Sequence, residues 1–269
     1  MAVVTGAGGV LCSEMAKALA ACGAQVALVG RTYSNVAVVA DEITANGGIA
    51  KAYAGNVLDR AGMENVAAQV EADFGKCDIL VNGAGGNNAK ANTDKEYYEP
   101  GDIDAETKSF FDLSDEGVQG VFNLNFIGTL IPTQVFTKQM VEKGGSVINI
   151  SSMNAYTPLT KIPAYSGAKA GISNFTQWLA THFAGTGIRC NAIAPGFLVS
   201  AQNKALLFNE DGTPTARSAK ILNGTPTGRF VDSAELLGGL FFLTDDKAAS
   251  AITGVVLPID CGFAAYSGV

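Results

Sequence analysis

Residues 2–30 of the chain read AVVTGAGGVLCSEMAKALAACGAQVALVG. An apolar run with β-branched residues is followed by a glycine-rich turn, an alanine-rich helical pattern and a second apolar run. A strand, a helix and a second strand in this order are typical of the βαβ unit of a parallel sheet. Gly23 stands where the helical pattern stops, and glycine is preferred just after a helix end. We therefore predict an α/β fold that begins with this unit.

The same alternation continues along the chain and predicts seven strands. After the first two, the apolar runs lie at residues 50–57, 78–85, 145–152, 189–196 and 254–260. Helical patterns lie at residues 35–48, 63–75, 128–144, 164–183 and 233–246. Gly47 and Gly75 close the first two of these patterns, as Gly23 closes the helix before them. Strands and helices in alternation predict a doubly wound, seven-stranded parallel sheet flanked by helices.

No linker rich in Pro, Ser or charge divides the chain, so its 269 residues predict a single domain spanning 1–269. Two polar stretches interrupt the alternation, an insert at 86–116 and a loop at 200–227. Long irregular segments in compact α/β proteins are usually lids or binding loops. We expect the second to contact the substrate. The alternative for both is that they pack against a neighbouring subunit.

Composition and charge narrow the choice of partners. Hydrophobic residues make up 48% of the chain and charged residues only 16%, which excludes a disordered or coiled-coil protein. The formal net charge is −7 and no Lys/Arg cluster interrupts it, which argues against nucleic acid or an anionic membrane as partner. No apolar run reaches the roughly 18 residues of a membrane span. We expect a cytoplasmic protein that acts on a small molecule.

Cysteine and histidine usage predicts neither a disulfide framework nor a metal site. The five cysteines are scattered and contain no C-x-x-C pair, so we expect thiols in a reducing compartment. His182 is the only histidine, which removes metal sites built on several histidines. A Ser-His-Asp hydrolase would depend on this one residue, and a packed or surface histidine is the simpler interpretation.

The first glycine-rich turn predicts a phosphate site. The backbone N–H groups of such a turn and the positive end of the helix dipole face an anion. The residues expected to line this site are Thr5, Gly6, Gly8, Gly9, Val10 and Leu11. The spacing is not G-x-G-x-x-G, because Leu11 stands in place of the third glycine. The alternative is a tight strand-to-helix turn that binds nothing.

The end of the second strand bears on which dinucleotide would bind. An acidic residue at this point often holds the ribose diol of NAD, whereas an arginine accommodates the 2′-phosphate of NADP. This chain has Gly30 and Arg31 there. The prediction is NADP or NAD with a slight preference for NADP, the alternative for Arg31 being a solvated surface residue.

Several stretches in a fixed order resemble the short-chain dehydrogenase/reductase family over essentially the whole chain. They are TGAGG at 5–9, NGAG at 82–85, NFIGT at 125–129, Ser152, YSGAK at 165–169 and APGF at 194–197. The resemblance implies a single-domain Rossmann fold and an NAD(P)-dependent oxidoreductase acting on CH–OH groups. It also implies self-association, and with the apolar stretch 175–183 and the tail 262–269 we expect a homotetramer.

The chain departs from the family pattern at four positions. Val10 and Cys12 stand where the first motif has its later glycines, and Gly83 replaces an asparagine. Asn56 stands where an acidic residue often precedes the valine at the adenine edge. The resemblance implies that the dinucleotide binds, and these departures bear on its affinity.

The resemblance assigns the catalytic roles to Ser152, Tyr165, Lys169 and Asn125. Tyr165 would be the general acid/base, and because a free phenol has a pKa near 10, the ammonium of Lys169 one helical turn later would favour the phenolate. Ser152 would hydrogen-bond the substrate oxygen, and Asn125 would hold a water that connects Lys169 to solvent. Each residue taken alone has a plain structural alternative.

The remaining contacts also follow from the resemblance. The further residues expected at the cofactor are Asn56, Val57, Asn82, Gly83, Ala84, Gly85, Pro195, Gly196, Leu198 and Ser200, with Tyr165 and Lys169 contacting it as well. The residues expected at the substrate are Asn87, Asn88, Lys90, Gln202 and Asn203. Lys90 would suit a carboxylate, although solvent exposure explains this lysine equally well.

A narrower likeness suggests the substrate. The stretches 83–99, 110–136 and 260–269 resemble the branch of the family described as D-mannonate oxidoreductase or fructuronate reductase. This branch implies a sugar-acid substrate of the D-mannonate/D-fructuronate type. The alternatives are reduction of a keto-gluconate or a 3-oxoacyl thioester, and a non-catalytic sensor of dinucleotide occupancy.

Overall fold

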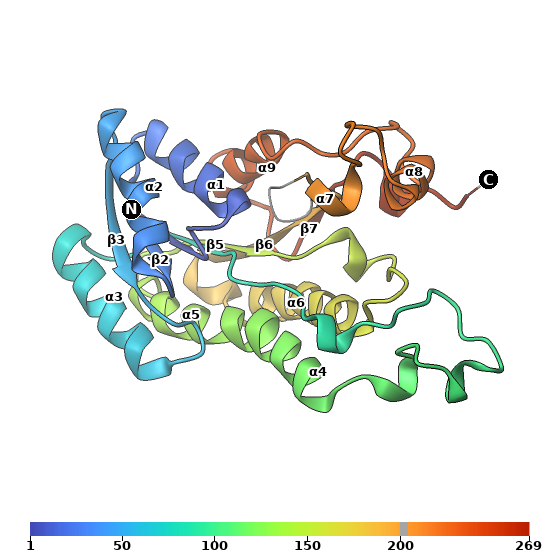
Figure 1. Cartoon of the computed structure of the whole chain (residues 1–269). Coiled ribbons are helices and arrows are strands. Elements are labelled where there is room, and N and C mark those ends of the chain that lie inside the picture. Colours follow the sequence, from blue (N-terminus) through green and yellow to red (C-terminus); the bar gives the residue numbers. More distant parts are fainter. Residues whose placement is uncertain (200–203, 269) are drawn as a thin grey trace.

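A seven-stranded parallel sheet forms the centre of the computed structural model, which describes residues 1–199 and 204–268 (Figure 1). Its strands are β1 (Ala2–Thr5), β2 (Gln25–Gly30), β3 (Ile49–Ala54), β4 (Ile79–Asn82), β5 (Gly145–Ile150), β6 (Ile188–Pro195) and β7 (Val256–Ile259). They lie in the order β3-β2-β1-β4-β5-β6-β7, and every neighbouring pair is parallel. The predicted Rossmann-like α/β fold is therefore confirmed.

Helices cover both faces of the sheet. One face carries α1 (Val10–Ala21), α2 (Tyr33–Ala45) and α9 (Glu235–Thr244), and the other carries α3 (Arg60–Phe74), α4 (Asp115–Phe122), α5 (Gly128–Phe136) and α6 (Pro163–His182) (Figure 1). Two apolar cores result, one on each face, and the side chains of β1 are completely buried between them. Met15 and Leu240 lie in the first core, and Phe136 and Leu80 lie in the second.

Glycines end the first three helices as expected. Gly23, Gly47 and Gly75 have φ values of 89°, 83° and 84°, in the left-handed region that other residues rarely adopt. The chain therefore leaves each helix in a tight turn and enters the next strand directly.

The pattern at 128–144 does not form the single helix that the sequence predicts. Helix α5 ends at Phe136 and is followed by the 3-10 turn η5 (Thr137–Gln139). It is preceded by α4 and by a π-helical turn, η4 (Asn123–Ile127). Pro132 lies inside α5 and has no N–H to donate to the preceding turn, which weakens the helix.

The two polar stretches contain more helical structure than expected. The insert 86–116 holds the 3-10 turns η1 (Ala89–Ala91), η2 (Asp102–Asp104) and η3 (Phe110–Asp112), and α4 begins at its end. The loop 200–227 holds the short helices α7 (Lys204–Leu207) and α8 (Ala216–Asn223). No helix within the described residues is long and apolar enough to cross a membrane.

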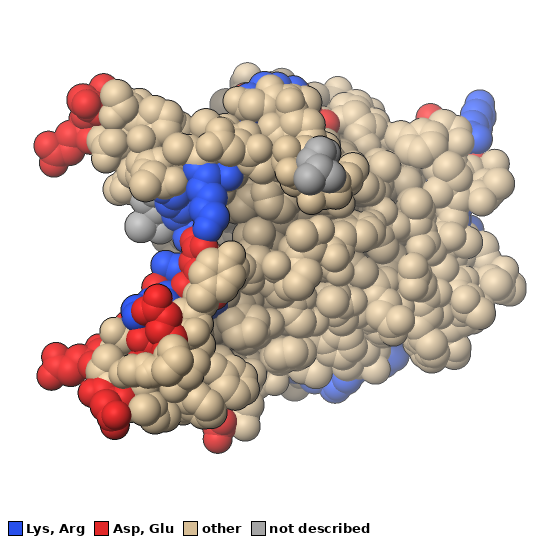
Figure 2. Space-filling model, turned by 90° about the vertical axis from the view of Figure 1, so that its right-hand side faces the viewer, with Lys and Arg blue, Asp and Glu red and all other residues tan. Residues whose placement is uncertain are grey.

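These two stretches meet beyond the carboxyl ends of the strands. Lys220 of α8 forms an ion pair with Glu96 of the insert, and the N–H of Thr93 donates to the carbonyl of Lys161 at 3.0 Å. Figure 2 shows Lys and Arg side chains in the hollow between two projecting lobes, with Asp and Glu at the outer tips. The mouth of this hollow is therefore formed by segments far apart in the sequence.

Candidate active site

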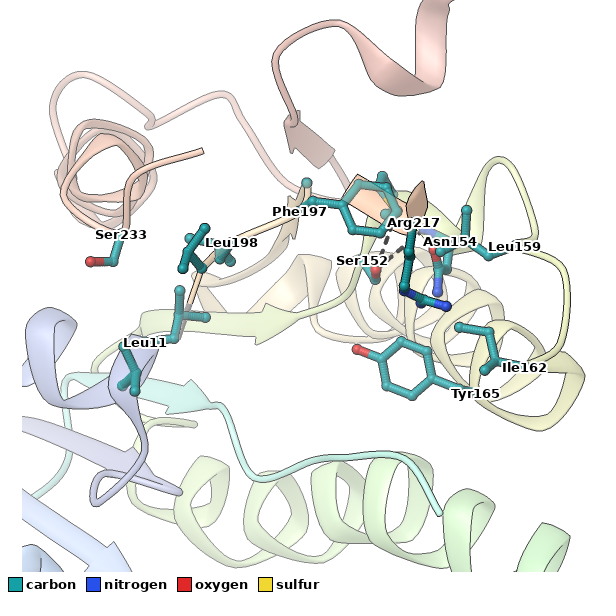
Figure 3. A pocket seen from close by; sticks show the side chains of 14 residues that line it. Leu11, Ser152, Asn154, Leu159, Ile162, Tyr165, Phe197, Leu198, Arg217 and Ser233 are labelled. Atoms are coloured by element: carbon teal, nitrogen blue, oxygen red, sulfur yellow. Dashed lines mark hydrogen bonds between the residues drawn. The ribbon is translucent and has the colours of Figure 1, made fainter. Parts of the chain in front are cut away.

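A cavity of about 340 Å³ lies at the carboxyl edge of the sheet, where open α/β sheets bind their ligands. Its walls come from the first turn, the segment after β5, α6, the segment after β6 and α8 (Figure 3). The apolar lining residues are Val10, Leu11, Met153, Leu159, Ile162, Phe197, Leu198 and Val199, and the others are Ser152, Asn154, Tyr165, Gly196, Arg217 and Ser233. A mainly apolar cavity thus holds a small set of polar groups.

Helix α6 brings Tyr165 and Lys169 to this edge. It begins with Pro163, whose fixed φ suits the first helical position. Four residues separate the tyrosine from the lysine, so both lie on one helix face, and the Lys169 ammonium lies 5.6 Å from the centre of the Tyr165 ring. Lys169 is only 5% exposed, and its Nζ donates to the carbonyl of Ile150 at 2.8 Å.

Burial dominates the ionisation of both groups. It lowers the pKa of Lys169 from 10.5 to about 8, because a buried ammonium is poorly solvated. It also raises the pKa of Tyr165, and the hydrogen bond with Ser152 opposes that rise. The expectation that Lys169 lowers the pKa of this phenol is therefore outweighed by desolvation.

Ser152 lies at the end of β5 beside the phenol. It is buried, and its Oγ accepts a hydrogen bond from the N–H of Asn154 at 3.2 Å in the 3-10 turn η6 (Met153–Ala155). The same hydroxyl lowers the pKa of the Tyr165 phenol, against the effect of burial. Two hydroxyl groups therefore face one point of the cavity, as binding of a substrate oxygen would require (Figure 3).

Asn125 is completely buried in the π-helical turn η4. Its Nδ2 donates to the carbonyls of Gly86 at 2.7 Å and Val121 at 2.8 Å, and its Oδ1 accepts from the N–H of Gly86 at 3.2 Å. A Cβ on Gly85 would lie 2.7 Å from this Oδ1 and 3.3 Å from the Nζ of Lys169. Asn125 and Lys169 therefore approach the same glycine, and the amide holds the segment after β4 in place.

A second cavity, of about 140 Å³, lies beside the first glycine-rich turn. Gly6, Gly30, Gly55 and Gly85 line it together with Arg31, Val57, Ala84 and Leu124. Gly6 has φ +67°, and a Cβ there would lie 2.9 Å from Ala84. Beside it α1 begins at Val10 without a side-chain cap at Gly9, so the first N–H groups of the helix are available to a phosphate. The cradle thus depends on the absence of side chains.

Two of the other residues expected at the cofactor, Thr5 and Asn82, form hydrogen bonds that hold this edge of the sheet together. Thr5 Oγ1 accepts hydrogen bonds from the N–H groups of Gly83 at 3.1 Å and Ala84 at 3.4 Å, so it orders the turn after β4. Asn82 bonds Thr133 and Asn149 at 2.9 Å each and thus joins β4 to β5 and α5.

Asn56, Gly8 and Pro195 also lie at this edge. The Oδ1 of Asn56 accepts from the N–H of Leu58 at 3.1 Å. A Cβ on Gly8 would lie 2.9 Å from the side chain of Asn35. Pro195 is buried at the end of β6, and Ser200 lies outside the described residues.

Two of the departures from the family pattern contact each other. A Cβ on Gly83 would overlap the Sγ of Cys12, and Cys12 is buried with its thiol pKa raised to about 12 by desolvation. The thiol therefore fills the space in which a side chain at position 83 would begin. A cysteine at 12 and a glycine at 83 form a complementary pair that keeps α1 packed against the turn after β4.

This contact predicts that Gly83→Ala destabilises the protein by about 1–3 kcal/mol in urea unfolding, the usual cost of overpacking. Cys12→Ala removes the Sγ, and the double variant Cys12→Ala/Gly83→Ala is expected to recover most of the loss. The nearest remaining contacts of the new methyl group would be Thr5 O at 3.1 Å and Cβ of residue 12 at 3.5 Å. Strictly additive effects of the two substitutions would contradict the pairing.

Of the residues expected at the substrate, the three that the structure describes, Asn87, Asn88 and Lys90, do not line this cavity. Asn87 donates to Asn92 at 3.1 Å, and Asn88 Oδ1 accepts from the N–H of Lys90 at 3.0 Å. The side chain of Lys90 is 65% exposed and lies 3.7 Å from Glu116. Gln202 and Asn203 lie outside the described residues.

Asn154 and Arg217 line the cavity but were not expected there. Asn154 follows Ser152 by two residues, a proximity that could have indicated it. Arg217 lies within the predicted substrate loop, yet nothing in the sequence separates it from the other charged residues of that loop. Among the residues that the structure describes, His, Cys, Asp and Glu form no group of three or more that could hold a metal ion.

Comparisons with known proteins agree with this geometry. The family model of short chain dehydrogenases matches residues 1–210. An uncharacterised oxidoreductase of Haemophilus influenzae is 60% identical over 99% of this chain and 94% of its own length, and one of Bacillus subtilis is 50% identical over 100% and 96%.

A solved structure adds a cofactor. The crystal structure of a candidate D-mannonate oxidoreductase of Haemophilus influenzae, with bound NAD, is 59% identical. It superimposes with a TM-score of 0.96 and covers 100% of this chain and 96% of that one. A nicotinamide dinucleotide as cofactor is thus supported, whereas the preference for NADP finds no support because this relative holds NAD.

Proposed function

The chain belongs to the short-chain dehydrogenase/reductase family, and from this premise we propose that it interconverts a secondary alcohol and a ketone on a sugar acid, with NAD as cofactor. The substrate we propose is of the D-mannonate/D-fructuronate type. The observation that carries the proposal is the meeting of Ser152, Tyr165 and Lys169 at one edge of the sheet, beside a cradle made of glycines. The likeness to a relative described as a candidate D-mannonate oxidoreductase supports the choice of sugar acid.

Tyr165 moves the proton in this proposal. In the oxidation direction its phenolate accepts the proton of the substrate hydroxyl, and in the reduction direction its phenol returns it. Ser152 donates a hydrogen bond to the substrate oxygen and stabilises the charge that develops there. A nicotinamide bound at this edge supplies the hydride acceptor for oxidation and the hydride donor for reduction.

In this proposal Lys169 and Asn125 assist Tyr165 without contacting the substrate. The ammonium near the Tyr165 ring favours the phenolate over what burial alone would allow. We propose that Lys169 also contacts the nicotinamide ribose, which is supported by the position of its Nζ at 3.3 Å from where a Cβ on Gly85 would lie. Asn125 fixes that wall through Gly86, and we propose that it also positions the water through which Lys169 exchanges protons with solvent.

The cofactor contacts in this proposal follow the two cavities. The N–H groups at the start of α1 and the turn of Thr5, Gly6, Gly8 and Gly9 would hold the pyrophosphate. Val57, Ala84 and Gly85 would face the adenosine half, and Gly196 and Leu198 the nicotinamide. Arg31 would cover the adenine without requiring a 2′-phosphate, which is compatible with NAD.

Two further functions were considered. A reductase of 3-oxoacyl groups on a carrier protein needs a basic patch for that acidic partner, and the net charge of −7 disfavours it. A non-catalytic sensor needs the glycine cradle but has no use for a buried lysine held beside a tyrosine. Neither is favoured by an observation of its own.

A substrate panel tests the proposal. Reduced cofactor is followed at 340 nm with D-mannonate, D-gluconate, simple secondary alcohols and a 3-hydroxyacyl thioester, each with NAD and with NADP. We expect sugar acids with NAD to give the highest kcat/KM. A response to simple alcohols or thioesters alone would refute the sugar-acid assignment, and a response only with NADP would refute the choice of cofactor.

We also propose a cytoplasmic homotetramer. The five cysteines are free thiols, as a reducing compartment would keep them. Along the outer face of α6 the rings of Phe175, Trp178 and His182 stack on one another, and Trp178 is 55% exposed. A second copy of this chain would cover that surface. Light scattering at micromolar protein is expected to give four times the 27.6 kDa chain mass, and a monomer mass would exclude the assembly.

A further inference from the structure

Arg217 reaches from α8 into the cavity that Ser152 and Tyr165 share. Figure 3 shows its guanidinium directed from the α8 side toward Tyr165 and Ile162. No hydrogen bond or ion pair joins this guanidinium to another residue in the parts of the chain that the structure describes. An arginine beside the reacting groups therefore has its donors available to a ligand.

The nearby carboxylate does not neutralise this charge. Glu96 is held by Lys220, which lowers the pKa of Glu96 by a hydrogen bond and by charge, and the charges of Lys161 and Arg217 act in the same direction. Three cations thus surround one carboxylate at the mouth of the cavity. Since the whole chain carries −7, this local excess of positive charge favours an anionic ligand at the mouth of the cavity.

Asn154 supplies an uncommitted polar group next to the arginine. The residue is 4% exposed, and its Oδ1 is buried without a hydrogen-bond partner among the described residues. A buried amide oxygen without a partner is costly, which makes a ligand hydroxyl its natural partner. The cavity therefore offers a cation for an acid group and an amide for a hydroxyl group, in addition to the two catalytic hydroxyls.

Three other basic residues near the mouth are already engaged. Arg229 forms two hydrogen bonds of 2.7 Å with Glu235, which lowers the pKa of that carboxyl to about 2. Lys90 lies against Glu116 and outside the cavity lining, and Lys220 is paired with Glu96. Arg217 alone among these four lines the cavity.

We propose that Arg217 binds the carboxylate of the substrate and is the residue by which the site selects a sugar acid over an uncharged sugar. This inference rests on the proposed function and adds the determinant of its substrate class. The planar guanidinium suits a carboxylate because it can donate two parallel hydrogen bonds. Asn154 would bind a hydroxyl group of the carbon chain between the carboxylate and the reacting carbon.

Steady-state kinetics with D-mannonate and D-gluconate test this role in Arg217→Met, Arg217→Lys and the control Lys220→Met. Lys220 lies on the same helix as Arg217, but it is paired with Glu96 and does not line the cavity. For Arg217→Met we expect kcat/KM to fall roughly 10- to 100-fold, mainly through KM, because a charge-assisted hydrogen-bonded pair is lost. Arg217→Lys is expected to recover part of this loss, and Lys220→Met to change kcat/KM less than about fivefold.

Three outcomes would overturn the inference. An unchanged KM in Arg217→Met, with normal turnover by the unmodified enzyme, would remove the role of Arg217 and leave the proposed function intact. If KM rises in Lys220→Met as much as in Arg217→Met, the effect comes from the overall positive charge at the cavity mouth and not from a contact of Arg217 with the substrate. Failure of the unmodified enzyme to turn over any sugar acid would refute the proposed function, and this inference with it. The melting temperature and the KM for NAD, expected to be unchanged, separate these results from misfolding.

Discussion

Replacing Tyr165 with phenylalanine is expected to lower kcat by roughly 10²–10⁴-fold, the usual contribution of a positioned general acid/base. The substitution removes one hydroxyl from the cavity and leaves the ring, so α6 and the cofactor cradle keep their packing. NAD affinity, measured by quenching of protein fluorescence, should therefore remain within about twofold of the unmodified value. A large loss of turnover with retained NAD binding is the signature of a missing proton carrier.

Tyr156→Phe is the matched control for this substitution. Tyr156 lies nine residues earlier, and its hydroxyl donates to the carbonyl of Val256 at 2.6 Å outside the cavity lining. Its loss should cost about 1 kcal/mol of stability and leave kcat unchanged. Equal effects of the two substitutions, or a Tyr165→Phe enzyme with normal turnover, would refute the role of the phenol.

The pH dependence of the unmodified enzyme provides a second test of Tyr165. Alcohol oxidation needs the phenolate, and burial raises the pKa of this phenol. The oxidation rate should therefore rise with pH through the neutral and alkaline range, whereas ketone reduction, which needs the phenol, should not.

Lys169→Met is expected to abolish most turnover and to stabilise the protein at the same time. Turnover falls because the cation that favours the Tyr165 phenolate is lost, by roughly 10²-fold or more. Stability rises because burial holds the pKa of Lys169 near 8 instead of 10.5, a difference that corresponds to at most about 3 kcal/mol of destabilisation at neutral pH. Thermal unfolding and 340 nm kinetics on the same preparation measure both effects.

The sign of the stability effect depends on pH. Between the folded value near 8 and the unfolded value of 10.5, the unfolded chain binds a proton that the folded chain does not. The destabilisation by Lys169 is therefore complete below pH 8 and disappears as pH rises to 10.5. The gain from Lys169→Met should be large at pH 7 and small at pH 10.

An exposed lysine serves as the control for Lys169. Lys51 is paired with Asp73 at 2.7 Å on the surface, so Lys51→Met should change stability by less than about 1 kcal/mol, with no gain, and should leave turnover unchanged. A Lys169→Met protein that is less stable than the unmodified one at pH 7 would show that burial of the Lys169 ammonium does not destabilise the fold.

Much of the fold could be predicted from local patterns. Each strand is a short apolar run. The helices before Gly23, Gly47 and Gly75 end where the chain needs a positive φ, and because glycine adopts this φ most readily, the sequence itself marks the helix ends. The division of 115–139 into α4, a π-helical turn, α5 and a 3-10 turn depends on tertiary contacts. Asn125 bonds Gly86, which lies 39 residues earlier, and no local pattern encodes that contact.

The candidate site divides in the same way. Tyr165 and Lys169 lie four residues apart on one helix, so their proximity follows from helix geometry. Arg217 reaches the cavity because α8 folds back over the mouth, where Lys220 of this helix also contacts Glu96, 124 residues earlier in the chain. The Cys12 and Gly83 pair likewise joins α1 to the end of β4. In the sequence, Cys12 and Gly83 are two separate departures from the family pattern. Only the packed structure shows that the two residues fit against each other.

Identification of the product tests the central claim most directly. Purified enzyme is incubated with D-mannonate and NAD alone, NADH is measured at 340 nm, and the product is analysed by ¹³C NMR for a new ketone carbon. We predict one equivalent of a keto acid for each NADH formed, and neither with Tyr165→Phe. NADH without a ketone, or no reaction of any sugar acid with NAD, would contradict the account.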